Sequence, residues 1–191
     1  MTTALPPPDT ANLKIKPITD RSDLVDFVCG EQEVDRGVPT SFEWQDLHRV
    51  RLFGAYMDGV PQAYGFYCVG ITAPSPKGID GTDIVRATEG RSFVPFIYLH
   101  YFGVRAGFQN QTIGTGLLGH FLTRCIYIVS HVGVFGAALN ALTPRAERLY
   151  SRYGFACRTG SARPLMILPT QSLLDLANPP RTAASSPSTR G

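Results

Sequence analysis

Residues 104–118, VRAGFQNQTIGTGLL, join a segment typical of a buried strand to a segment typical of a helix. The strand is predicted over Val94–Val104, a run of aromatic and β-branched residues. The helix is predicted over residues 114–130, where apolar side chains recur on one face. A loop at such a junction leaves backbone N–H groups at the positive end of the helix dipole, which suits a pyrophosphate. A glycine-rich turn that binds nothing would have the same pattern.

Common catalytic and phosphate-binding motifs do not match this junction or the rest of the chain. No Gly-Lys-Ser/Thr follows the loop, and its glycines are misplaced for a dinucleotide fingerprint. We find no Ser-His-Asp arrangement and no HExxH motif. The four cysteines are scattered and form no C-x-x-C pair, so we expect small core residues, no metal and a reducing cytoplasm.

Upstream of the junction, the patterns predict strands, two helices and a hairpin. Leu13–Pro17 alternates as a strand, and Thr19 or Ser22 is expected to cap a helix that carries Leu24 and Phe27. A second, poorer helix is predicted up to Asp46, interrupted at Gly37 and Pro39. A hairpin comes next, with strands over 50–57 and 61–71 around an Asp58-Gly59 turn, and a Gly- and Asp-rich loop insertion is predicted over 74–90.

Downstream of the junction, an apolar run over 126–142 has 17 residues, close to the lower limit for a membrane span. Because it contains Ser130, His131 and Asn140, a helix end followed by a buried strand explains it better, and we expect no membrane contact. The remaining predicted elements are a strand over 133–139, a helix from Pro144 to Tyr153, strands over 155–158 and 163–168, and a helix over 170–176. The order predicts one mixed α/β domain over 13–176, with disordered tails over 1–12 and 177–191.

Charge is distributed unevenly along the chain. Residues 1–90 carry a net charge of −5, whereas residues 91–191 carry +8, and all ten cations of the second half are arginines. This asymmetry favours an anionic ligand, either a phosphorylated cofactor or nucleic acid, because arginine can hold a phosphate through two hydrogen bonds. Drift in surface composition is the simpler alternative.

The junction resembles motif A of the GNAT superfamily of N-acetyltransferases, whose pattern is Arg/Gln-x-x-Gly-x-Gly/Ala. With Phe108 and the Leu-Leu pair aligned, Gln109 matches the first position and Gly114 the last. Thr112 replaces the middle glycine. If that position requires a positive φ, a β-branched residue is strained there, and the loop is reshaped or binds its cofactor more weakly.

A second match lies in Ala146-Glu-Arg-Leu-Tyr150-Ser-Arg-Tyr153-Gly-Phe155, which resembles motif B of the same family. Two further segments, Phe27-Val-Cys-Gly30 and Arg163-Pro-Leu-Met-Ile-Leu-Pro169, resemble the TacT/AtaT-type toxins, which acetylate the amino acid on charged tRNA. The resemblance covers about residues 13–175. It implies a GNAT fold, a mixed and mostly antiparallel central sheet flanked by helices. Asn140, where those toxins usually carry Asp, and the 74–90 insertion depart from the pattern.

The resemblance also implies roles for individual residues. Tyr150 occupies the position of the general acid that protonates the departing thiolate, although by spacing alone it reads as a core aromatic residue. The residues implied for binding acetyl-CoA are Phe102, Gly103, Val104, Gln109, Asn110, Gln111, Thr112, Ile113, Gly114, Thr115, Asn140 and Arg145. By helical spacing, Arg145, Arg148 and Arg152 form a basic stripe, which is either a solvated face or, together with Arg158 and Arg163, a surface for a tRNA backbone. His100 is a candidate base, but an α-amine is already partly neutral near pH 7–8.

Three functions remain open on these observations. The first is a toxin that acetylates aminoacyl-tRNA, is silenced by an antitoxin protein and forms a homodimer, as the resemblance implies. The second is an ordinary N-acetyltransferase that acts on a small-molecule or protein amine, favoured by the acidic first half. The third is a fold that binds without catalysis, motivated by Thr112.

Overall fold

The computed structural model describes residues 5–7, 12–73, 93–158 and 162–178. They form a seven-stranded sheet in the order β1-β2-β3-β4-β5-β7-β6, in which only the β4–β5 pair is parallel. The strands are β1 (Lys14–Pro17), β2 (Val50–Tyr56), β3 (Gly65–Thr72), β4 (Phe96–Val104), β5 (Gly136–Asn140), β6 (Ala156–Cys157) and β7 (Leu165–Pro169). The predicted fold class, a mixed and mostly antiparallel sheet flanked by helices, is therefore confirmed.

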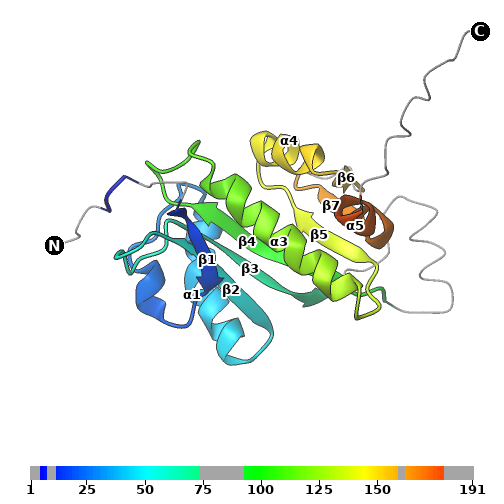
Figure 1. Ribbon diagram of the computed structural model, residues 1–191, viewed down its shortest axis with the longest axis horizontal. Helices are drawn as coiled ribbons and strands as arrows, with labels where there is room; N and C mark the ends of the chain where they lie inside the picture. The colour runs from blue at the N-terminus through cyan, green and yellow to red at the C-terminus, as the bar shows by residue number, and fades with distance from the viewer. Residues whose placement is uncertain (1–4, 8–11, 74–92, 159–161, 179–191) are drawn as a thin grey trace, which may run out of the picture.

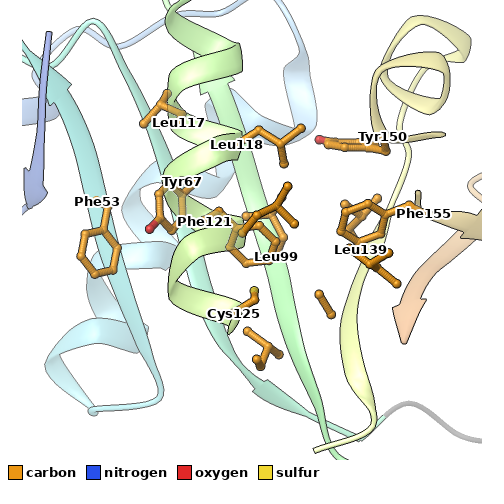
Figure 2. Close-up of a cluster of buried hydrophobic side chains, with 14 of the residues drawn as sticks. Phe53, Tyr67, Leu99, Leu117, Leu118, Phe121, Cys125, Leu139, Tyr150 and Phe155 are labelled. Carbon is orange, nitrogen blue, oxygen red and sulfur yellow. The ribbon is translucent and has the colours of Figure 1, made fainter. Parts of the chain in front are cut away.

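Helices cover both faces of this sheet (Figure 1). They are η2 (Arg21–Leu24, a 3-10 turn), α1 (Gln32–Asp46), α3 (Ile113–Val129), α4 (Pro144–Arg152) and α5 (Thr170–Ala177). Adjacent residues of β2 point to opposite faces: Leu52 packs with α1, and Phe53 packs with α3. Figure 2 shows the larger core, which runs beneath α3 from Phe53 to Phe155.

A bulge in β4 changes which of its side chains face each helix layer. The register of β3 against β4 shifts between Cys68 and Val69, so His100 has no opposite residue in β3. Before the shift Leu99 faces the α3 layer, and after it Phe102 does so, whereas Tyr101 faces α1. Strict alternation would have put Leu99 and Tyr101 on the same face. The bulge thereby brings aromatic side chains to both sides of one strand end.

The first predicted helix is wrong. Only one 3-10 turn forms, and its cap is Asp20, whose carboxylate accepts a hydrogen bond from Ser22 N at 2.8 Å, rather than Thr19 or Ser22. The chain cannot continue as a helix because Asp26 has a φ of 50°. In addition, the buried Arg105 side chain donates hydrogen bonds to the carbonyl oxygens of Val25 and Asp26.

The predicted interruption of the second helix is also wrong, since α1 runs through Gly37 and Pro39. An internal proline costs about 3 kcal/mol. Val34, Val38 and Phe42 are all buried on one face of α1, and each contributes roughly 1.5–3 kcal/mol. A side chain at residue 37 would lie 2.3 Å from the Tyr101 ring, so the glycine is required by close packing rather than by a break in the helix.

Other predicted features fare differently. The β2–β3 hairpin is confirmed, but only Gly59 of the turn has a positive φ, 77°, and the connection spans residues 57–64.

Cys157 is exposed, unlike the other three cysteines, so it is not the core residue that was predicted. In the part of the chain that the structure describes, every helix is too short or too polar to cross a membrane.

Most of the predicted tails and the whole 74–90 insertion lie outside the described residues. Within the first tail, Leu5 packs against the larger core, and the Tyr64 hydroxyl donates a hydrogen bond to Pro6 O at 2.9 Å.

Candidate active site

A cleft opens where the two parallel strands separate. The paired residues of β4 and β5 end at Leu99 and Leu139, but β4 continues to Val104. On its other edge β4 remains paired with β3 as far as Val104. Among the described residues, Tyr101–Val104 therefore have a strand partner on one side only, and the edge toward the cleft presents backbone donors and acceptors. The cleft has a volume of about 830 Å³.

The loop after β4 forms one end of this cleft. Thr112, the residue before α3, has a φ of 63°, and its hydroxyl donates to Gln111 O at 2.6 Å instead of capping the helix. The first turn of α3 carries no acidic residue. Gly114 and Thr115 of that turn line the cleft. The helix end therefore offers backbone N–H groups and positive potential to an anionic ligand.

The structure divides the loop residues predicted to bind the cofactor. Most of them line the cleft: Phe102, Gly103, Val104, Gln109, Asn110, Thr112, Gly114 and Thr115. Gln111 lies outside the cleft lining and donates to Gly107 O at 3.3 Å, and Ile113 is fully buried in the core. The Ile113 side chain is therefore not placed to contact a ligand in the cleft.

Side chains also tie the loop to its surroundings. The Gln109 amide donates to Cys29 O at 2.7 Å, which fastens the loop to the 29–30 segment of the opposite wall. Arg145, at the start of α4, donates to the Asn110 side-chain oxygen. Cys29 itself is buried, and burial raises the pKa of its thiol to about 12, so it is a thiol at neutral pH.

Tyr150 lies on α4 at the edge of the larger core. Thr143 caps this helix by accepting from Ala146 N at 3.1 Å, and Pro144 follows at its first position, as predicted. The Tyr150 ring is 6% exposed and packs edge-on against Phe102 and Phe155, with centroids 6.3 and 6.0 Å away. In Figure 2 its hydroxyl points from α4 toward α3. Burial raises the pKa of the phenol, so the hydroxyl keeps its proton at neutral pH.

The wall on the α1 side consists of residues that the sequence did not single out, apart from His100. Tyr98, His100 and Tyr101 of β4 line it together with Glu33 of α1. The His100 ring packs 5.2 Å from Trp44 and 4.9 Å from Tyr98. Burial and the nearby Arg49 lower the pKa of His100, so its ring is neutral at pH 7.

Asn140, predicted among the cofactor residues, also lines the cleft, at the end of β5. Its side chain accepts from the Tyr98 hydroxyl and donates to Arg163 O at 3.0 Å. These contacts place it on the α1 side of the cleft rather than beside the helix end. Of the predicted basic stripe, Arg145 and Arg152 line the cleft and Arg148 does not, and Arg158 also lies outside the cleft lining.

The backbone at Thr112 yields the first prediction. A left-handed conformation costs a residue with a side chain about 1–2 kcal/mol, and β-branching adds to the strain. Thr112→Gly should therefore raise the free energy of unfolding by about 1 kcal/mol, measured by urea denaturation. The matched control is Thr115→Gly, which lies in the regular helix and should lower it by about 0.5 kcal/mol. A loss of stability in Thr112→Gly would show that its hydroxyl contact outweighs the strain.

No protein-family model matches the chain. Its fold is shared with solved structures of two proteins, KacT and AtaT. A Tyr-to-Phe mutant of KacT is 22% identical, with 86% of this chain and 99% of KacT covered and a TM-score of 0.74. AtaT complexed with acetyl-methionyl-tRNAfMet is 20% identical, with 86% and 99% covered and a TM-score of 0.72. A mutant AtaT toxin bound to acetyl-CoA and the C-terminus of the antitoxin AtaR is 20% identical, with 87% and 99% covered and a TM-score of 0.68. The likeness shows that this chain has the fold of KacT and AtaT.

Proposed function

We propose that this chain is an acetyl-CoA-dependent N-acetyltransferase that acetylates the α-amine of aminoacyl-tRNA, as the toxin of a cytoplasmic toxin–antitoxin pair. One observation carries the proposal: a single cleft joins an open strand edge, an uncapped helix end and a buried, protonated tyrosine. The fold shared with AtaT and KacT supports it, because AtaT has been solved with acetyl-CoA, with an acetylated aminoacyl-tRNA and with an antitoxin.

The chemistry requires three functions from the protein. Acetyl-CoA supplies the acetyl group as a thioester. The open edge of β4 at Phe102–Val104 would hold the amides of the pantetheine arm, and the first turn of α3 with Arg145 would hold the pyrophosphate. Tyr150 would donate its proton to the sulfur as the C–S bond breaks and the new N–C bond forms, while the amine loses a proton to solvent.

The acceptor assignment has one competitor. Glu31 and Glu33 both line the cleft, and a carboxylate wall would also suit a small cationic amine or a lysine side chain. An acetyltransferase of that kind would use the same cofactor residues and the same tyrosine. The two functions therefore differ in the acceptor alone.

The test is to incubate the protein with labelled acetyl-CoA and total aminoacyl-tRNA, and then to separate RNA, protein and small molecules. We expect the label on the aminoacyl ester, released by mild alkali as an N-acetylated amino acid. Label on a free amine or on protein instead would favour the competing function. If no label is transferred and calorimetry detects no acetyl-CoA binding, both enzymatic functions are wrong.

A further inference from the structure

An ion pair spans the α1 side of the cleft. Arg163, in the loop before β7, pairs with Glu33 in the first turn of α1. Glu33 lines both the cleft and a smaller adjoining hollow of about 410 Å³, and Arg163 lines the hollow. Glu33 therefore reaches both spaces, and the ion pair holds the Arg163 guanidinium beside it.

The backbones beneath this pair are held by other contacts. Asn140 donates to Arg163 O at 3.0 Å, and its side-chain oxygen accepts from the Tyr98 hydroxyl. At the start of α1, Asp35 accepts from the backbone N–H groups of Cys29 and Gly30 at 2.8 and 3.3 Å. The two charged side chains can therefore change partners while their main chains stay in place.

Solvent exposure makes such an exchange easy. The Arg163 and Glu33 side chains are 62% and 39% exposed, and exposed ion pairs contribute little to stability. The Glu33 carboxylate also contributes to the raised pKa values of Tyr98 and Tyr101, after burial, which places its charge near the strand that forms the cleft wall. A ligand bearing both a cation and an anion could replace the pair without leaving either charge alone.

We propose that Glu33 and Arg163 recognise the acceptor by breaking their mutual ion pair. The Glu33 carboxylate then binds the primary amine, and the Arg163 guanidinium binds a neighbouring phosphate. This inference rests on the proposed acetylation of aminoacyl-tRNA. An amino acid esterified to the terminal nucleotide of an RNA carries both groups close together. Uncharged RNA offers the phosphate alone, so Glu33 is the residue that distinguishes charged from uncharged tRNA.

The test measures binding of aminoacyl-tRNA and of the same tRNA uncharged, without acetyl-CoA. The wild-type protein should prefer the charged form. Glu33→Gln should weaken binding of the charged form about 10-fold and leave the uncharged form unchanged. Arg163→Gln should weaken both forms alike and reduce the slope of log Kd against log salt by about one. The control Glu43→Gln, an exposed carboxylate on the same helix, should change neither affinity.

A reversed pair separates recognition from a purely structural role. The double variant Glu33→Arg with Arg163→Glu keeps an attractive pair, so its KM for acetyl-CoA and its melting temperature should stay at wild-type values. Its preference for charged tRNA should be lost. Restoration of that preference by the reversed pair would overturn the inference.

The inference and the proposed function fail differently. If the wild-type protein acetylates aminoacyl-tRNA and Glu33→Gln keeps the wild-type preference, only the inference is wrong. If the wild-type protein acetylates no RNA, both are wrong.

Discussion

Replacing Tyr150 by Phe is expected to lower the turnover of acetyl transfer about 10²- to 10⁴-fold, the usual contribution of a general acid. The substitution removes one hydroxyl from a ring that is 6% exposed and packed against Phe102 and Phe155, so the core stays filled. Affinity for acetyl-CoA should be retained because the ring still lines the cleft. Turnover is measured with labelled acetyl-CoA, and affinity by calorimetry.

The matched control is Tyr153→Phe, which alters the second tyrosine of the same segment. Tyr153 ends α4 and packs against the larger core without lining the cleft. Its loss of a hydroxyl should change turnover less than about twofold. Equal turnover in Tyr150→Phe and the wild-type protein would show that another group protonates the thiolate.

Replacing Arg105 by Met is expected to lower the free energy of unfolding by about 3–5 kcal/mol. Arg105 is 9% exposed, and its guanidinium group donates to Ala63 O, Asp26 O and Val25 O at 2.8, 2.8 and 2.9 Å. A hydrogen bond to a charged group contributes about 1.5–3 kcal/mol, and the buried Ala63 carbonyl, left without a donor, costs about 1–3 kcal/mol more. The free energy of unfolding of a whole domain is only about 5–15 kcal/mol, so this one side chain accounts for a large share of it.

Urea denaturation measures this loss, with Arg124→Met as the control. Arg124 stacks over the Phe53 ring at 5.1 Å, and that exposed contact is worth about 1 kcal/mol or less. Equal losses in the two variants would contradict a special role for Arg105. Because Arg105 holds the 25–30 segment that Gln109 contacts, the folded fraction of Arg105→Met should also bind acetyl-CoA more weakly.

Much of the fold was predictable because its signals are local. The apolar face of α3, the Thr143–Pro144 start of α4 and the glycine of the β2–β3 turn each act within a few residues. The strain at Thr112 was expected only through the resemblance to motif A, which has a glycine at that position, and its φ of 63° agrees with that expectation. Local patterns failed at α1, where burial of one face outweighs the cost of Pro39.

The sequence by itself thus determined the order of the strands and of the helices after the first predicted one, the loop before α3 and the position of the tyrosine on α4. Only the tertiary structure decided the bulge at His100, the separation of β4 from β5, the three carbonyl contacts of Arg105 and the pairing of Glu33 with Arg163. Each of these depends on residues far apart in the chain, and periodicity carries no information about which distant segments meet. The cleft is built from such contacts, so its two walls became identifiable only once the sheet was assembled.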